Sequence, residues 1–287
     1  MSGRCPICGG TARHTALVHR DGRLARCLGC RLVSVDPLPA RETALAQYDA
    51  AYFAGDVGYR DYGAEEAHFR REFRRRLARI RAAGGRGRLF DVGAATGAFL
   101  LEAREAGFTV AGVEPADAVA SRARARGLDV ATGTAETFVR EPASVDVLTC
   151  SDVLEHLVDP VVALRRFRAA LAPGGLLVLC VPDFGGLWAR VSGARWPFVT
   201  PKEHLHYFTR RTLRRALEVA GYAPHGLGLA GTPVSLGSLA RRLLGPAGRS
   251  VERSLGRRAN AGLALPFGTL WAVARRSMRS EGGSLRP

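Results

Sequence analysis

Downstream of residue 85, short apolar runs alternate with longer segments in which apolar residues recur every three or four positions. The short runs predict strands, and the longer segments predict helices. Strands are expected at 88–92, 109–114, 128–133, 145–151, 174–182 and 269–276. Helices are expected at 98–107, 116–127, 160–171 and 209–221. This alternation predicts an α/β fold in which helices cover both faces of a mainly parallel sheet.

Further helices are predicted on either side of this pattern. Upstream, Phe69, Phe73, Leu77 and Ile80 recur at helical spacing within an arginine-rich stretch, and we interpret the arginines as a solvated face. Two short basic amphipathic helices are predicted within residues 235–260, between the last two strands. That insert could contact a membrane surface or a partner protein, but we favour a solvated extension over the active site.

These patterns divide the chain of 287 residues into one large domain and smaller flanking parts. We expect a small cysteine-containing module at 1–40 and a tyrosine-rich, helical linker at 41–84. The main domain is expected at 85–278, followed by a disordered tail at 279–287.

Charge changes this picture only slightly. The net charge is +16, and the basic residues are arginines apart from Lys202. Such a bias is more typical of genome composition than of a surface that binds polyanions, so we expect no DNA partner and do not favour RNA. The charge remains consistent with a small anionic substrate. The sequence shows neither an apolar run of 18 residues nor a signal peptide, so we expect a cytoplasmic protein.

Four cysteines form two closely spaced pairs near the N-terminus. Cys5 and Cys8, and then Cys27 and Cys30, are each separated by two residues. This spacing is typical of a four-cysteine zinc site, and four protein ligands indicate a structural Zn²⁺ ion. Two disulfide bonds are the alternative, although a cytosolic protein keeps its thiols reduced. The resulting zinc ribbon would serve as a lid or docking element, or would bind nucleic acid.

The loop after the first strand of the main domain reads DVGAATG, with Asp91 at the end of the strand and Gly93 and Gly97 in the loop. Dinucleotide-binding turns instead carry a G-x-G-x-x-G pattern. An acid at this place would repel a pyrophosphate, but it suits a ligand with a cationic amino or sulfonium group. A second acid, Glu114, ends the next strand, where it suits a ribose diol. Together these features predict S-adenosylmethionine (SAM) as the cofactor.

The main domain contains, in order, the stretches DVGAATG, GVEP, GTAETF, VDVLTCSDVLEHL and LAPGGLLVLCVP. These resemble the successive motifs of the class I SAM-dependent methyltransferases, and the resemblance covers roughly residues 85–225. It implies a Rossmann-like sheet of seven strands with the last strand antiparallel. The residues that it implies at the cofactor are Asp91, Gly93, Ala95, Gly97, Glu114, Pro115, Ala135, Glu136 and Ser151. At Ala95 many members of the family carry glycine, so the pocket would be narrower here.

The resemblance also implies which part of the cofactor each residue contacts. Gly93 and Gly97 would line the methionine part. Ala135 and Glu136 would lie near the adenine, and Ser151 beside the transferable methyl group. With the cysteine module and the tyrosine-rich linker, the chain is similar to methyltransferases that have an N-terminal zinc-binding module, several of which act on nucleotide-linked deoxysugars.

Methyl transfer requires alignment of the acceptor with the methyl group and removal of one proton from the acceptor. His156 follows the fourth strand of the main domain, and histidine accepts a proton near neutral pH. The segment PKEHLHYF, which holds Glu203 and His204, resembles the Glu-His-x-x-Tyr-Phe segment of sugar C-methyltransferases. This resemblance implies that Glu203 and His204 support proton abstraction beside a keto group. Alternatively, the segment only precedes a helix that Thr209 caps.

Tyrosines are the expected contacts to the acceptor. Tyr52 and Tyr59 in the linker, and Tyr207 after the histidine segment, would form part of the substrate pocket. A tyrosine combines apolar area with a hydroxyl group. For the linker tyrosines, packing of the small module on the main domain is the alternative role.

The sequence therefore predicts an enzyme that transfers a methyl group from SAM to a small, anionic acceptor such as a nucleotide-linked sugar. O-methylation of a phenol, a quinol or a lipid-linked acceptor is a second enzymatic hypothesis. An RNA-modifying or RNA-binding protein, and a SAM-binding module without catalytic activity, are hypotheses of other classes.

Overall fold

A computed structural model of the chain describes residues 3–46, 62–137, 140–235, 240, 246–256 and 262–277. Its main sheet contains β4 (Arg88–Val92), β5 (Thr109–Glu114), β6 (Asp129–Thr132), β7 (Val145–Ser151), β8 (Leu171–Pro182), β10 (Tyr222–Ser235) and β11 (Gly262–Arg276). The helices that pack on it are α3 (Tyr62–Ala82), α4 (Ala98–Glu105), α5 (Asp117–Ala125), α6 (Pro160–Ala170) and α8 (Arg210–Val219). The predicted strands and helices of the main domain are confirmed, apart from shifts at their ends.

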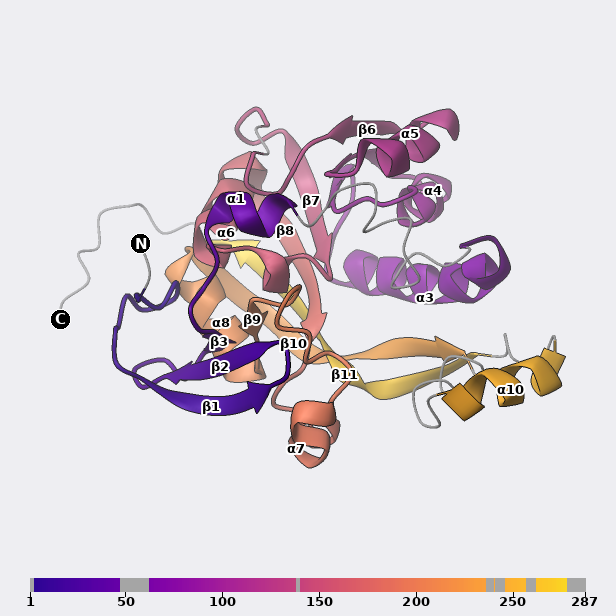
Figure 1. Cartoon of the computed structure of the whole chain (residues 1–287). Helices are drawn as coiled ribbons and strands as arrows, with labels where there is room; N and C mark the ends of the chain where they lie inside the picture. The colour runs from indigo at the N-terminus through magenta and orange to yellow at the C-terminus, as the bar shows by residue number, and fades with distance from the viewer. Residues whose placement is uncertain are drawn as a thin grey trace.

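The seven strands lie in the order β10-β11-β8-β7-β4-β5-β6. β4, β5, β6, β7 and β8 pair in parallel, whereas β11 runs antiparallel to both of its neighbours. The fold class and the reversed last strand are therefore as predicted. The strand β10 was not among the expected strands, and β11 begins earlier than expected, because the two form a long hairpin that extends beyond the sheet (Figure 1).

Helices lie on both faces of the sheet (Figure 1), and a cluster of buried hydrophobic residues lies on each face. On one face, buried residues of α6 and α8, such as Phe167 and Leu217, pack against the strands. On the other face, Leu77 and Ile80 of α3 pack with residues of α4 and α5. A sheet covered on both faces requires apolar side chains at successive positions, which explains the continuous apolar run in β8. No helix within the described ranges is long and apolar enough to cross a membrane.

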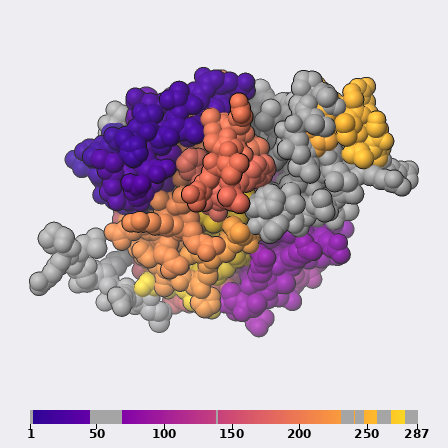
Figure 2. Space-filling model, turned by 90° about the horizontal axis from the view of Figure 1, so that it is seen from below, coloured from indigo at the N-terminus to yellow at the C-terminus, as the bar shows by residue number. Residues whose placement is uncertain are grey.

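The N-terminal module contributes β1 (Arg13–His19), β2 (Gly22–Cys27) and β3 (Val33–Val35) to a second sheet. The fourth strand of this sheet, β9 (His206–Tyr207), comes from the main domain and pairs with β3. On the surface, the module lies against the segment of α7 (Leu187–Ser192) and η2 (Gly193–Arg195) (Figure 2). The module is thus joined to the main domain through shared strand pairing.

Two turns bring the four cysteines of the module together. The Sγ atoms of Cys5 and Cys30 are 3.3 Å apart, and those of Cys8 and Cys27 are 3.5 Å apart. These distances exceed the S–S bond length of about 2.05 Å, so the cysteines are not disulfide-bonded. One Sγ atom from each cysteine lies within 4.8 Å of the others. This donor set fits a structural Zn²⁺ ion, which takes four thiolates in a tetrahedron.

Gly9, Gly10 and Gly29 lie beside the cysteines, and of these three Gly9 has a positive φ angle. Gly9 follows Cys8 with a φ angle of 71°, and Arg31 follows Cys30 in the second turn with a φ angle of 73°. Gly10 and Gly29 instead leave room for sulfur, because a Cβ atom on either would lie 3.4 Å from the Sγ atom of Cys8.

Some features predicted from the sequence fall on residues that the structure does not describe. These are the linker tyrosines Tyr52 and Tyr59, most of the first predicted helix of the insert, and the tail from 278 onward. The second helix of the insert is present as α10 (Pro246–Leu255), between β10 and β11 in the chain. It lies at the far end of their hairpin (Figure 1).

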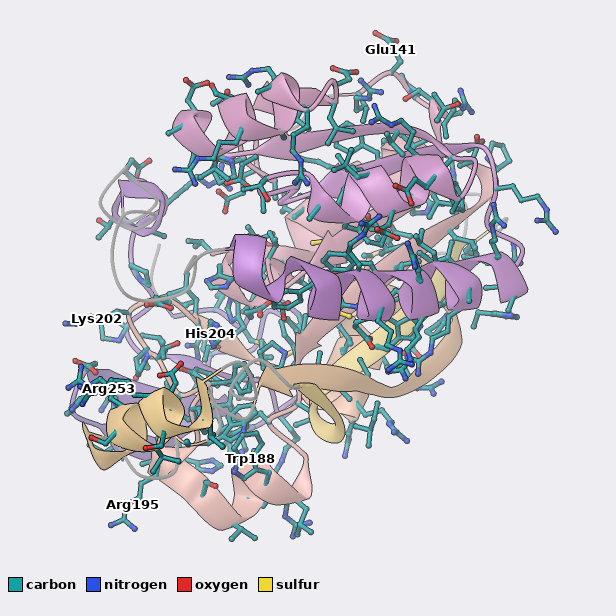
Figure 3. The ribbon with its side chains drawn as sticks, turned by 90° about the vertical axis from the view of Figure 1, so that its right-hand side faces the viewer. Glu141, Trp188, Arg195, Lys202, His204 and Arg253 are labelled. Carbon is teal, nitrogen blue, oxygen red and sulfur yellow. The ribbon has the colours of Figure 1, made fainter. Side chains whose placement is uncertain are left out.

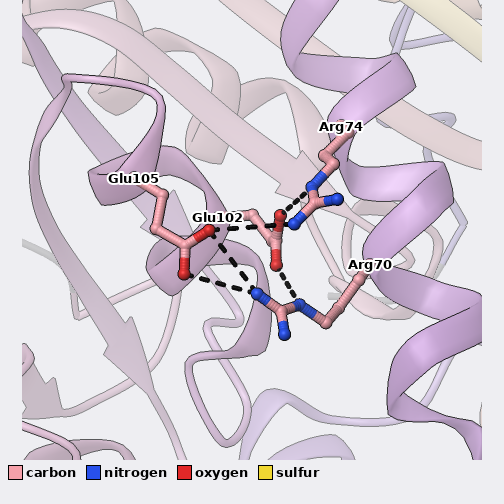
Figure 4. Close-up of polar contacts among 4 residues, drawn as sticks. All are labelled: Arg70, Arg74, Glu102 and Glu105. Carbon is pink, nitrogen blue, oxygen red and sulfur yellow. Dashed lines mark hydrogen bonds and ion pairs between the residues drawn. The ribbon is translucent and has the colours of Figure 1, made fainter.

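An ion-pair cluster fixes α3 against α4 (Figure 4). The buried carboxylate of Glu102 accepts hydrogen bonds from the Nε atoms of Arg70 and Arg74, the latter at 2.7 Å. The exposed Glu105 pairs with Arg70 at 3.3 Å and with Arg74 at 3.9 Å. The arginines of α3 are therefore more than a solvated face, because some of them hold this helix on the main domain.

Replacing Cys27 with serine is expected to remove the zinc ion and to lower stability, because binding at a structural zinc site contributes folding free energy. Elemental analysis should find about one zinc ion per wild-type chain, as one tetrahedral site requires, and far less in Cys27→Ser. Cys150→Ala, which changes a buried cysteine of β7, should retain its zinc. Wild-type protein without zinc, or full zinc content in Cys27→Ser, would contradict the assignment.

Glu102→Gln is expected to lower the free energy of unfolding at pH 7 by about 1–2 kcal/mol. The substitution removes the buried negative charge that pairs with two partly exposed arginines. The exposed variant Glu105→Gln should cost less than about 0.5 kcal/mol. Chemical denaturation measures both values.

The same cluster predicts a pH dependence. Burial alone would raise the pKa of Glu102, but the hydrogen bonds from Arg70 and Arg74 lower it below its ordinary value. This stabilisation is complete above the ordinary pKa of the unfolded state and is lost as the pH falls through the lower folded-state pKa. The difference between wild type and Glu102→Gln should therefore shrink below about pH 4. If the difference in unfolding free energy between wild type and Glu102→Gln stays constant from pH 7 to pH 3, this explanation is wrong.

Candidate active site

A cavity of about 360 Å³ lies at the carboxyl ends of the parallel strands. Its wall consists of the loops that follow β4, β5, β6 and β7, together with side chains of α3, α4 and the segment before β9. Loops at this edge of a parallel sheet are the usual place for a ligand in doubly wound folds. Eight of the nine residues predicted at the cofactor line this cavity: Asp91, Gly93, Ala95, Glu114, Pro115, Ala135, Glu136 and Ser151.

The turn after β4 requires a glycine. Gly93 has a φ angle of 80°, and a Cβ atom there would lie 2.5 Å from Cγ2 of Val153. Ala95 also has a positive φ angle, 49°, which explains why glycine suits this position and why alanine is strained here. The backbone of this loop therefore approaches the cavity closely.

Glu114 fixes this loop from the neighbouring strand. Its Oε2 atom accepts a hydrogen bond of 2.9 Å from the N–H of Ala95, and its Oε1 atom accepts one of 3.2 Å from the N–H of Ala116. Its side chain is buried, and desolvation raises its pKa despite these hydrogen bonds. Each carboxylate oxygen accepts more than one hydrogen bond, so Glu114 would still accept from the hydroxyls of a ribose.

Gly97 differs from the expectation. It does not line the cavity, and it precedes α4 with a φ angle of 78°. A Cβ atom on Gly97 would lie 2.2 Å from Cδ1 of Leu128 and 3.2 Å from Cβ of Ala123. We therefore correct its role: this glycine allows α4 to approach α5 and the start of β6.

Asp91 is buried at the end of β4 and lines the cavity. Its Oδ1 atom accepts a hydrogen bond of 2.6 Å from the hydroxyl of Thr149, which lies opposite it on β7. Burial nevertheless raises the pKa of Asp91 to about 7. A cationic ligand group beside Asp91 would favour the ionised carboxylate, which fits the amino or sulfonium group of SAM.

The other end of the cofactor site also fits SAM. Glu136 is buried in the cavity wall, and its Oε2 atom has no hydrogen-bond partner among the described residues. A buried acceptor without a donor is costly, and an amino group such as that of adenine would satisfy it. Ala135 lies beside it, and Ser151 lines the cavity at the end of β7.

Two histidines face each other in the cavity wall. The ring centroids of His156 and His204 are 4.7 Å apart, in an edge-to-face arrangement. The Nδ1 atom of His156 lies 3.0 Å from the carbonyl oxygen of Glu203, and that of His204 lies 2.8 Å from the carbonyl oxygen of Phe198. Burial lowers the pKa of both histidines, that of His156 to about 3. In Figure 3 His204 lies within the molecule rather than on its outline.

Glu203, Tyr207 and Thr209, the other residues singled out in this segment, do not share the contacts of the two histidines. Glu203 lines the cavity, but its contact with His156 is made by its backbone carbonyl. Tyr207 does not line the cavity and is instead buried with Val33 and Trp196 in the core of the module. Strand pairing of β9 with β3 turns this side chain into the core, so its predicted substrate contact is corrected. Thr209 caps α8, as the alternative hypothesis expected, by accepting a hydrogen bond from the N–H of Thr212.

The cavity includes residues that the sequence analysis did not identify as functional. Arg76 of α3 lines it, 3.6 Å from Glu72 and with its Nη1 atom 3.5 Å from the Oγ atom of Ser151. The aromatic rings of Phe73 and Phe99 also lie in the wall, with centroids 5.5 Å apart. Helical spacing predicted that Phe73 is on an apolar face, but no local signal indicated that this face borders a cavity.

Comparison with known proteins agrees with the fold. A family model described as a methyltransferase domain matches residues 65–225, which is more than half of the chain. The chain therefore belongs to this family of methyltransferase domains, and its seven-stranded sheet has the class I fold.

Solved structures show the same fold. The YcgJ protein of Bacillus subtilis aligns with a TM-score of 0.51 and 16% identity, over 73% of this chain and 99% of that chain. A chain in the complex between the Haloferax volcanii Trm112 methyltransferase activator and a methyltransferase aligns with a TM-score of 0.51 and 18% identity, over 69% and 84% of the two chains.

Curated relatives match over shorter stretches. The ubiquinone biosynthesis O-methyltransferase of Caulobacter sp. (strain K31) is 34% identical over 99 residues, 32% of this chain and 39% of the relative. A 37.1 kDa protein in transposon TN4556 of Streptomyces fradiae is 32% identical over 124 residues, 40% of this chain and 36% of the relative. The chain thus matches about two fifths of the length of these relatives.

Glu114→Gln is expected to weaken SAM binding about 10- to 100-fold, because a hydrogen bond to a charged acceptor contributes about 1.5–3 kcal/mol. Isothermal titration calorimetry measures the Kd. Glu141→Gln changes an exposed residue at the outer edge of the molecule (Figure 3) and should leave the Kd within about twofold. An unchanged Kd in Glu114→Gln would place the ribose elsewhere.

Proposed function

We propose that the protein transfers the methyl group of SAM to a hydroxyl oxygen of an acceptor held beside His156 and His204. The observation that carries this proposal is the contact between the two imidazole rings, 4.7 Å between centroids, in the wall of the cavity that also holds Asp91 and Glu114. The acids suit the cofactor, and the histidines supply a place where the acceptor can lose its proton.

The tautomer of His204 supports this role. A carbonyl oxygen only accepts hydrogen bonds, so the Nδ1 atom that contacts Phe198 carries the proton and Nε2 offers a lone pair. Because burial lowers the pKa of His204, its ring is neutral near pH 7. SAM supplies the activated methyl group, and the enzyme only has to orient the acceptor and take up its proton.

The weak basicity of both histidines narrows the acceptor. An imidazole with a lowered pKa removes a proton efficiently only from a group that is itself fairly acidic. A phenol, with a pKa of about 10, meets this condition better than an alcohol does. The rings of Phe69, Phe73 and Phe99 line the cavity and suit an aromatic acceptor. We therefore favour a phenol or quinol, in agreement with the names of the O-methyltransferases that share part of this sequence.

A nucleotide-linked sugar is the second candidate acceptor. It is favoured by the net charge of +16 and by the presence of both Glu203 and His204 in the cavity wall. Among the described lining residues, however, Arg76 is accompanied by several acids: Asp91, Glu114, Glu136, Asp152 and Glu203. The phosphates of such an acceptor would therefore lie outside the cavity, with only the sugar inside it.

Methyl-labelled SAM distinguishes these candidates when it is incubated with the purified chain and a panel of phenols, quinols and nucleotide-linked sugars. Mass spectrometry should detect an O-methylated phenol or quinol. A methyl group on a sugar carbon would instead support the second candidate and the Glu203–His204 pair, and would contradict phenolic methylation.

His204→Gln is expected to reduce kcat by about 10²- to 10⁴-fold, the usual contribution of a positioned base, while the Kd of SAM stays within about twofold. His14→Gln changes an exposed histidine of β1 and should leave kcat unchanged. If kcat survives in His204→Gln, or if SAM binding is lost with it, the proposed role is wrong.

The pH dependence of the rate gives a further prediction for His156 and His204. Because burial lowers the pKa of His156 and His204, both remain in the neutral, proton-accepting form below their ordinary titration range. At saturating SAM, which favours the ionised form of Asp91, the midpoint of the loss of kcat should therefore lie below the ordinary histidine pKa of about 6.5. A loss of activity with a midpoint near 6.5 would show that the base is an unperturbed histidine.

A further inference from the structure

Glu155 is a buried acidic residue beside His156 in the chain. It lies in the short helix η1 (Leu154–His156) that follows β7, and only 1% of it is exposed. Neither carboxylate oxygen has a hydrogen-bond partner among the described residues. A buried carboxyl group of this kind is costly unless a donor or a cation satisfies it. The mechanism proposed above makes no use of it.

The two histidines of the cavity lie beside this carboxylate. Glu155, His156 and His204 each offer one ligand atom, and these atoms lie within 4.8 Å of one another. Metal–ligand bonds of about 2.0–2.2 Å place neighbouring ligand atoms about 3–4 Å apart, so modest side-chain rotation would bring the three atoms onto one ion. Two imidazoles and one carboxylate are a donor set that suits divalent first-row metal ions.

The backbone holds the histidines in the way that metal ligands are usually held. A histidine that binds a metal commonly donates its other ring N–H to a carbonyl or carboxylate oxygen, which fixes its tautomer and orientation. His204 makes such a contact through Nδ1 with the carbonyl oxygen of Phe198 at 2.8 Å. His156 contacts the carbonyl oxygen of Glu203 through Nδ1 at 3.0 Å.

Glu155, His156 and His204 lie where a bound metal ion would face the cavity. His156 and His204 line the cavity, and Ser151, at the end of β7, lines the same cavity. Three protein ligands leave coordination positions open, and an open position beside a cavity is typical of a catalytic rather than a structural metal site. The four cysteines form a separate group that already has a full set of ligands.

We propose that Glu155, His156 and His204 bind a divalent metal ion whose open positions take the acceptor hydroxyl. The identity of the acceptor rests on the function proposed above, whereas the metal site rests on the cluster itself. With the metal bound, the histidines would act as its ligands and not as the base, so the bound hydroxyl, which coordination to a cation would make more acidic, would release its proton to solvent. Its oxygen then attacks the methyl carbon of SAM, the C–S bond breaks, and the sulfur keeps the electron pair in S-adenosylhomocysteine.

Manganese(II) is a suitable probe, because it prefers nitrogen and oxygen ligands and does not compete well for the thiolates of the module. The zinc-loaded full chain is titrated with Mn²⁺, and the free ion is followed by electron paramagnetic resonance. We expect the wild type to bind Mn²⁺, and Glu155→Gln and His204→Gln to bind it at least about tenfold more weakly. Glu203→Gln, which changes a neighbouring carboxylate outside the cluster, should bind Mn²⁺ as the wild type does.

SAM affinity serves as the folding control for each variant. If Glu155→Gln loses SAM binding, the comparison rests on His204→Gln. The proposal is overturned if the wild type binds no Mn²⁺ at millimolar concentration, or if folded variants bind it as tightly as the wild type does.

The metal site and the proposed function can fail separately. Methyl transfer to a phenol by a chain that binds no Mn²⁺ would overturn the metal site and leave the proposed function intact. Mn²⁺ binding that depends on Glu155, without methyl transfer to any phenol or quinol, would support the metal site and overturn the proposed acceptor.

Discussion

The pairing of β3 with β9 is the constraint on which the acceptor end of the cavity depends. The N–H of Val35 in the module donates to the carbonyl oxygen of Leu205, and the N–H of Leu205 donates to that of Glu155, both at 2.9 Å. The segment around Leu205 is therefore held between the module on one side and the loop after β7 on the other. His204 belongs to this segment and lines the cavity, so the N-terminal module supports part of the cavity wall.

The cofactor end depends on a different constraint, the register of the parallel strands. Asp91 pairs with Thr149 on one side and with Gly112 on the other, which aligns the ends of three strands. This alignment places Glu114 where it holds the backbone of Ala95 and faces the cavity. One part of the molecule thus supports the cavity wall around Asp91 and Glu114, and another supports the wall around His204.

The sequence predicted residues that line one end of the cavity because their signals are local: an acid at a strand end and a glycine in the next turn are adjacent in the chain. It could not predict the burial of Tyr207 or the contact between His156 and His204, because these depend on pairing between residues far apart in the sequence. Gly97 has the right residue type for the cofactor loop, but it packs on Leu128. β10 was missed because its glycines and prolines obscure the alternation expected of a strand.

Hydrogen exchange on the Cys27→Ser variant tests the dependence of the acceptor end on the module most directly. Mass spectrometry of peptides that span 203–208 and β4 would measure the protection of each part. We expect the amides of 203–208, including that of Leu205, to lose protection, while those of β4 keep it. Unchanged protection of 203–208 in a variant that has lost its zinc would show that the segment is held without the module.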